Sequence, residues 1–119
     1  MQIDELLKNV LDTLDARKGQ FITSIDVRGK TSVTDYMVIA TGTSERHVHS
    51  LCDYVVEKVK DNGFKPLGVE GGPGSEWVLV DLGDVILHVM TAQTREFYQL
   101  EKLWETDFSE DASQAEQVV

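Results

Sequence analysis

The Gly83-Asp84 dipeptide, which separates two apolar runs, constrains the fold of this chain more than any other feature. Glycine accepts the positive φ that a two-residue hairpin loop requires, so the dipeptide predicts a tight turn between two antiparallel strands. The turn sets the register and pairs, on one face, Leu82 with Val85, Val80 with Leu87 and Val78 with Val89. Because side chains alternate along a strand and all of these are apolar, this face of the hairpin is predicted to be core.

The opposite face of the hairpin mixes large apolar side chains with an imidazole and a carboxylate. It carries Trp77, Leu79, Asp81, Ile86, His88 and Met90. If this face is open, its apolar side chains form a patch rimmed by Asp81 and His88, and exposed patches of that kind mark interfaces. If the last helix covers it, the patch is core instead. The residues by themselves leave both alternatives open.

Apolar residues recur at helical spacing in two segments, and a third segment is dense in aromatic side chains. The first stripe runs from Ile3 to Leu14, and Gly19 is expected at the C′ position beyond the helix end. The second stripe runs from Val48 to Val59. The last helix is expected from Thr94 to Trp104, and its aromatic side chains need burial on the sheet or in a partner.

Three further stretches predict strands, at Phe21–Val27, Tyr36–Thr41 and Lys65–Val69. The near-continuous apolar run of Tyr36–Thr41 is typical of a central strand that is covered on both faces. The strand-helix-strand order predicts that Lys65–Val69 runs parallel to it, through a right-handed crossover. The order α-β-β-α-β-β-β-α predicts a single α/β domain over residues 1–104, with helices packed on a mixed sheet of about five strands.

The net charge of −10 limits the partners of this chain. A body this acidic is repelled by phosphate backbones, so we expect little direct nucleic-acid binding and favour a basic protein surface. The single cysteine, Cys52, lies on the second helical stripe and is expected to be an inert core thiol. The absence of a signal-peptide pattern, and of any run near about 18 apolar residues, predicts a cytoplasmic protein without a membrane span. Residues 105–119 are acidic and predict a disordered tail.

Phosphate and metal sites receive weak support from the sequence. Gly42–Ser44 precedes a helix, whose N-terminus could attract an anion, but no glycine-rich nucleotide motif accompanies it and a simple N-cap by Thr43 or Ser44 is favoured. His47 and His49 lie two apart on a helix and point in different directions, so they cannot share an ion. We therefore expect no cofactor and no metal.

Carboxylates offer the strongest alternative to a binding function. The α/β pattern loosely resembles a nucleotidyltransferase scaffold, in which strand carboxylates hold two magnesium ions. Asp81 and Asp84, however, straddle the tight turn and do not alternate on one strand face, and Asp26 and Asp35 sit at strand ends. We expect the scaffold without the active site. A nucleotidyltransferase-like enzyme or a nucleotide-binding module remains the alternative function.

Several blocks of the chain resemble the ribosomal silencing factor family, also called the Iojap family. They read DVRGKTSVTDYMVIATGTSERHV, PLGVEG, WVLVDLGDVILHVM and REFYQLEKLW, and the resemblance covers roughly residues 3 to 104. The family implies a non-enzymatic factor that binds the large ribosomal subunit through large-subunit ribosomal protein fourteen. It implies that the bound factor keeps the small subunit off and so represses translation. It also implies homodimers of the free protein and a role in large-subunit assembly.

The candidate partner-binding residues come from the hairpin and the last helix. They are Trp77, Asp81, His88, Arg95, Tyr98, Leu100, Glu101 and Trp104. Trp77, Tyr98 and Leu100 are expected to be apolar anchors. Asp81 and Glu101 are expected to meet basic groups, and Arg95 either contacts the partner or braces the loop against Asp81. A third hypothesis is a general adaptor for any basic protein, with affinity that salt abolishes.

Overall fold

Helices and strands follow one another in the predicted order within the residues that the computed structural model describes, 2–100 and 102. They are α1 (Ile3–Ala16), β1 (Gln20–Asp26), β2 (Tyr36–Gly42), α2 (Glu45–Asp61), β3 (Gly68–Glu70), β4 (Trp77–Asp81), β5 (Val85–Thr91) and α3 (Ala92–Tyr98). The predicted α/β class is confirmed. Among the described residues, no helix is both long enough and apolar enough to cross a lipid bilayer.

The strands form one mixed sheet of five in the order β1-β2-β5-β4-β3. β2 and β5 run parallel, and the other neighbouring pairs are antiparallel. The hairpin has the predicted register, with Val80 opposite Leu87 and the Leu82 N–H donating to the Val85 carbonyl over 2.9 Å. β3 runs parallel to β2 as predicted, but β5 and β4 lie between them and β3 begins at Gly68 instead of Lys65.

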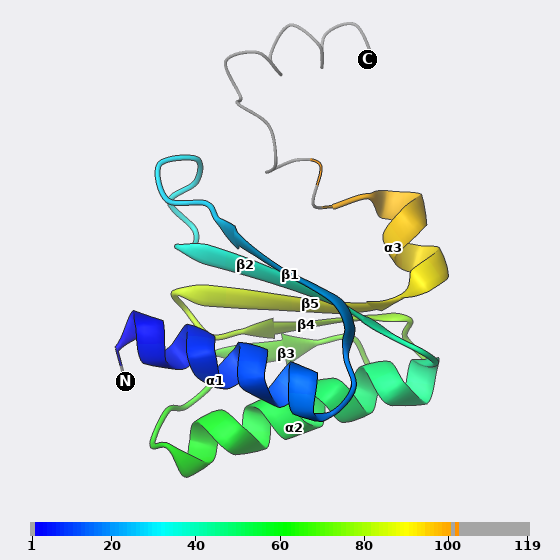
Figure 1. The fold of residues 1–119 in the computed structure, drawn as a ribbon, viewed down its shortest axis with the longest axis horizontal. Helices are drawn as coiled ribbons and strands as arrows, with labels where there is room; N and C mark the ends of the chain where they lie inside the picture. Colours follow the sequence, from blue (N-terminus) through cyan, green and yellow to red (C-terminus); the bar gives the residue numbers. More distant parts are fainter. Residues whose placement is uncertain (1, 101, 103–119) are drawn as a thin grey trace, which may run out of the picture.

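The two faces of the sheet are covered differently. α1 and α2 lie side by side on the first face, below the sheet in Figure 1, where their apolar stripes meet the apolar face of the hairpin. This core contains Leu6, Val10, Leu14, Val38, Ala40, Val48, Leu51, Cys52, Val55, Val59, Val78, Val80, Leu82, Val85, Leu87 and Val89. The predicted core face of the hairpin is therefore confirmed. The opposite side of the sheet, here called the second face, has α3 at the carboxyl end of β5 (Figure 1).

Cys52 is buried in this core, as the sequence predicts. Its side chain is 3% exposed, and burial raises the pKa of its thiol to about 12. The thiolate is the reactive form of cysteine, so this thiol is unreactive at neutral pH.

The end of α1 differs from the prediction by one residue. Arg17 caps the helix, and Lys18 adopts the left-handed conformation at φ 66°, where the sequence predicts Gly19. Gly19 is favoured for a different reason. Its N–H donates to the Leu14 carbonyl over 2.7 Å, and a Cβ there would lie 3.0 Å from that oxygen. The glycine thus permits a close return of the chain towards β1.

The last helix is shorter than predicted and starts earlier. Thr91 caps α3, because its hydroxyl accepts from the Thr94 N–H at 3.4 Å, and the helix ends at Tyr98. Gln99 adopts the left-handed conformation at φ 47° and its N–H donates to the Arg95 carbonyl, which closes the helix. The prediction of a helix through residue 104 is therefore wrong at Gln99. Glu101, Trp104, the boundary at residue 104 and the tail lie outside the described residues.

Candidate partner-binding site

The mixed face of the hairpin is neither fully open nor fully covered, so neither of the two alternatives that the sequence leaves open holds for the whole face. On β5, Met90 is fully buried, and His88 and Ile86 are 6% and 9% exposed. On β4, Trp77 and Leu79 are half-buried. The difference follows from strand order, because β5 is flanked by β2 and β4, whereas β4 has only the short β3 on its outer side. The β5 half is therefore core, and the β4 half is accessible.

A second, smaller core explains why the β5 half is covered. It consists of Val27, Met37, Ile39 and Met90, with Ile25, Trp77 and Leu100 packed against it. Leu100 follows α3 and is half-buried, so its side chain packs inward onto this cluster. Of the predicted apolar anchors, Leu100 thus contributes mainly to the packing of the second face.

His88 holds the indole of Trp77 through a hydrogen bond on the second face. Trp77 Nε1 donates to His88 Nδ1 over 2.9 Å, and the ring centroids lie 5.7 Å apart. Because Nδ1 accepts, the proton of the neutral imidazole lies on Nε2. Burial lowers the pKa of His88 to about 4, so the ring is neutral at pH 7. We expect His88 to orient Trp77, since its own side chain is nearly inaccessible.

Aromatic side chains continue from Trp77 onto α3. The Tyr98 ring lies 4.8 Å from the Trp77 ring, tilted by 53°, and the Phe97 ring meets Tyr98 edge-on at 4.9 Å. Phe97 is 78% exposed and Tyr98 is 55% exposed. Trp77, Phe97 and Tyr98 are here called the aromatic ledge. No residue of α3 is buried, so Phe97 and Tyr98 are an exposed aromatic surface beside Trp77, which is half-buried and packs against the second core.

Phe97 is the residue of the ledge that the sequence-based site prediction misses. Consecutive residues on a helix point about 100° apart, so Phe97 and Tyr98 cannot both face the sheet. That geometry is a signal present in the sequence. The expectation of a helix through Trp104 leads away from this conclusion, because a longer helix offers Phe97 other neighbours against which it could be buried.

Arg95 does not brace the loop against Asp81. Its guanidinium donates to the Phe21 carbonyl at 2.6 Å and to the hydroxyls of Thr41 and Thr23 at 3.0 and 3.1 Å. Asp81 lies at the turn end of the hairpin, the end away from α3, where its carboxylate accepts from the Gly83 N–H at 2.9 Å. The predicted pair is therefore wrong, because α3 follows the far end of β5.

Asp26, His47 and His49 have structural partners, the last through a hydrogen bond between its ring Nε2 and the Ser75 carbonyl. Asp26 forms a two-point ion pair with Arg28, whose hydrogen bonds lower the pKa of Asp26 to about 2. Ser44 caps α2 as predicted, accepting from the His47 N–H at 3.1 Å. The His47 ring lies between the Thr43 N–H and the Arg17 carbonyl. Within the described part of the chain, no three His, Cys, Asp or Glu side chains are grouped to hold a metal ion.

Almost the whole chain matches a known family. The family model described as "Ribosomal silencing factor during starvation" matches residues 1–118. The chain belongs to the ribosomal silencing factor family. The resemblance predicted from the sequence blocks is thereby confirmed.

Relatives in the ribosomal silencing factor family align over most of the chain. A ribosomal silencing factor of Haemophilus influenzae is 48% identical over 99 residues, which covers 83% of this chain and 97% of the relative. A mouse protein named "Mitochondrial assembly of ribosomal large subunit protein 1" is 37% identical over 103 residues, covering 84% of this chain and 44% of the relative. A crystal structure of a Chromobacterium violaceum protein superposes with a TM-score of 0.86 at 40% identity, covering 90% of this chain and 89% of that one.

Proposed function

We propose that this chain silences translation by docking its aromatic ledge on a basic protein of the large ribosomal subunit. The family and the names of its relatives support an association with ribosomes and a regulatory, non-enzymatic role. The observation that carries the docking site is the exposure of Phe97 and Tyr98 beside a fixed Trp77. Aromatic side chains are enriched at the centres of interfaces, because their rings bury a large apolar area.

Charge supports a basic partner. The chain carries a net charge of −10, and exposed carboxylates flank the ledge at Glu96 on α3 and at Glu76 before β4. Charges at the rim of an interface raise the rate of association with a surface of opposite sign. Within this proposal Asp81 and Glu101 meet further basic groups. The family resemblance implies that the partner is large-subunit ribosomal protein fourteen.

The proposed mechanism is steric. A domain bound at the subunit-joining face of the large subunit occupies space that the small subunit needs. Its acidic surface also repels the ribosomal RNA that approaches it. No bond is made or broken, and translation falls because fewer subunits join. A homodimer of the free protein that covered the same ledge would compete with ribosome binding.

A role in large-subunit assembly is a second candidate function. The mouse relative is named for assembly of the ribosomal large subunit, and its match covers 84% of this chain. The same docking on a large-subunit protein would serve both roles, since a factor that binds early can remain until the subunit is complete.

The test is sedimentation of purified ribosomal subunits with and without the protein, at a magnesium concentration that joins them. We expect the protein to travel with the large subunit and the joined peak to fall. Phe97→Ala should weaken binding by about 30-fold or more, because an anchor truncation costs about 2 kcal/mol. Tyr54→Ala is the matched control, since Tyr54 is an aromatic residue of α2, on the opposite face of the sheet. Its affinity should be unchanged.

Two outcomes would overturn the proposal. If the protein stays at the top of the gradient and joining is unaffected, it does not act by docking on the large subunit. If both variants weaken binding equally, the ledge is not the docking site. The nucleotidyltransferase alternative has its own test, in which magnesium and nucleotides are added to labelled protein. Amide signals that stay in place at Asp26, Asp35, Asp81 and Asp84 exclude it.

A further inference from the structure

α3 carries two rings of the aromatic ledge, yet little of the helix is anchored by burial. It has seven residues, and none of them is buried. A helix this short is not stable by itself, because the first turn costs more free energy than the few hydrogen bonds return. Contacts with the sheet must therefore set its position. Two of its side chains face the sheet, Tyr98 over Trp77 and Arg95 over β1 and β2.

Arg95 connects α3 to residues far away in the sequence. Its Nη1 donates to the Phe21 carbonyl at 2.6 Å and to Thr41 Oγ1 at 3.0 Å, and its Nη2 donates to Thr23 Oγ1 at 3.1 Å. The guanidinium is planar and rigid, so several bonds from one group fix direction as well as distance. These contacts join the start of β1, the end of β2 and α3 at one point.

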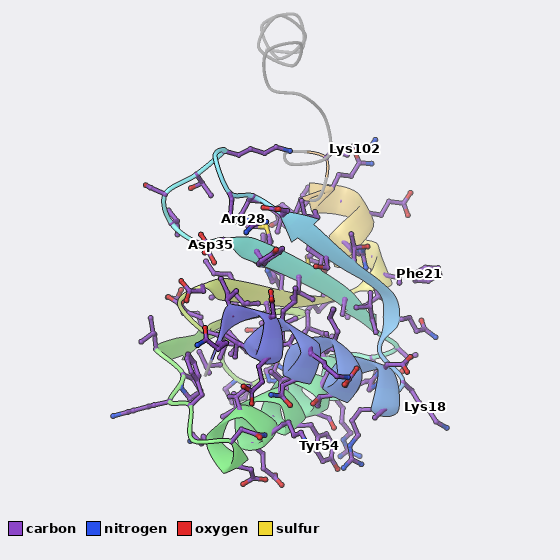
Figure 2. All side chains as sticks on the ribbon, turned by 60° about the vertical axis from the view of Figure 1, so that its left-hand side comes forward. Lys18, Phe21, Arg28, Asp35, Tyr54 and Lys102 are labelled. Carbon is purple, nitrogen blue, oxygen red and sulfur yellow. The ribbon has the colours of Figure 1, made fainter. Side chains whose placement is uncertain are left out.

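One of these acceptors, the Phe21 carbonyl, belongs to an irregular part of the β1 backbone. The pairing of β1 with β2 is irregular between Gln20 and Thr23, and Phe21 within this bulge has φ 48°. A left-handed conformation is unfavourable for phenylalanine and persists only where the surroundings hold it. The ring does not explain it, since it is 76% exposed and points away from the sheet (Figure 2). The Phe21 carbonyl explains the left-handed conformation, because it accepts a hydrogen bond from Arg95.

We propose that Arg95, with the Phe21 carbonyl, Thr23 and Thr41, forms a latch that sets α3 so that the Tyr98 ring packs against Trp77. Arg95 is then a positioning residue for the docking site. Arg95 and Tyr98 are three residues apart, so they lie on neighbouring turns of the same side of α3. Fixing one side chain on the sheet therefore fixes the other. The effect on binding rests on the proposed function, whereas the latch itself can be tested on the free protein.

Direct contact with the partner is the competing explanation for Arg95. The guanidinium lines an open groove between β1 and α3, together with Glu96 and Lys102. A partner that entered this groove would meet Arg95 itself. The two explanations differ in whether loss of Arg95 changes the environment of Trp77 in the absence of any partner.

The first experiment records the indole N–H signals of the full chain by nuclear magnetic resonance. The chain has two tryptophans, and loss of a signal in Trp77→Phe assigns the one from Trp77. Tyr98→Ala gives the position of this signal without the neighbouring Tyr98 ring. We expect Arg95→Met to move the signal towards that position. Gln93→Ala, an exposed change on the same helix, should leave it in place. Phe21→Gly should do the same, because it keeps the carbonyl.

The second experiment measures affinity for the large subunit. Arg95→Met should weaken binding by about tenfold or more with an unchanged urea midpoint, since no side chain of α3 is buried. The triple variant Arg95→Met, Phe97→Ala, Tyr98→Ala should bind within about twofold of the double variant Phe97→Ala, Tyr98→Ala, because a latch acts only through the rings it positions.

An indole signal that Arg95→Met leaves in place would overturn the latch. A further loss of affinity in the triple variant would also overturn it, because that loss would mark Arg95 as a direct contact. If the wild-type chain fails to bind the large subunit, the proposed function fails. The indole signals would still decide whether the latch exists.

Discussion

Single residues on the second face have separable roles. His88 is nearly inaccessible and accepts the hydrogen bond of Trp77, whereas Trp77 is half-buried and contacts Tyr98. The imidazole thus determines where the indole lies, and the indole carries the contact. Such a division predicts that changes at His88 alter stability first and binding as a consequence.

Acidification should destabilise the fold through His88. The pKa of His88 is about 4 in the folded chain and ordinarily 6.5, so the unfolded chain binds more protons between these limits. Stability from the neutral imidazole is complete above about pH 6.5 and is lost as the pH falls towards 4. At pH 5 the loss is about 2 kcal/mol relative to pH 7. Asp81 and Glu70 are charged side chains of β4 and β3 on the same face, and the Arg95 guanidinium lies over β1 and β2 on that face as well.

Urea unfolding at pH 7 and pH 5, on the wild type and on His88→Gln, checks this prediction. The variant cannot titrate at this position, so its free energy of unfolding should fall less with acid. The comparison cancels the contributions of His47 and His49, which both proteins share. Equal losses in the two proteins would show that His88 does not carry the effect.

At the scale of elements, sequence patterns predict those features that depend only on residues near one another in the chain. The hairpin register follows from Gly83 and from the alternation of apolar side chains, both of which lie within a few residues of each other. The end of α3 does not follow in this way, because Gln99 adopts a conformation usual for glycine or asparagine. The same holds for Lys18 at the end of α1.

Contacts between distant segments could not be predicted. The acceptors of Arg95 lie 54 to 74 residues earlier in the chain, and only the placement of β2 beside β5 brings them under α3. The partial burial of the mixed hairpin side depends on the same strand order. For this reason the sequence predicts the region of the candidate site, whereas the roles of Arg95, His88 and Phe97 follow from the structure.

α3 should open without unfolding the rest of the domain. It lacks buried side chains, whereas α2 buries Val48, Leu51, Cys52, Val55 and Val59. Segments with few buried apolar contacts open locally, at a lower free energy than global unfolding. Hydrogen exchange should therefore be faster in residues 92–98 than in residues 45–61. Arg95→Met should raise the rate in α3 and leave α2 unchanged. Equal protection of both helices in the wild type would contradict this picture.

At the scale of the whole molecule, charge and shape act together. A net charge of −10 attracts basic surfaces in general, and the aromatic ledge adds an apolar contact in one place. Long-range attraction between exposed charges is screened by salt, whereas apolar burial is not. The salt dependence of binding therefore separates a specific docking factor from a general adaptor.

For a specific factor, raising the salt from about 50 to about 300 mM should weaken binding by less than about tenfold. Trp77→Ala should weaken it at both salt concentrations, because the lost contact is apolar. Binding measured by sedimentation or interferometry at the two salt concentrations checks this. A general adaptor would lose its affinity in salt and keep it in Trp77→Ala.

β4 places core and candidate docking residues at alternate positions of one strand. Even-numbered positions of β4 face the helices and odd-numbered ones face the second side, so each set can change in evolution without the other. The number of residues in β4, in contrast, cannot change. One inserted or deleted residue within Trp77–Asp81 would send every following side chain to the wrong side. Related chains should therefore tolerate insertions in the 71–76 loop, which precedes β4, and exclude them from the strand.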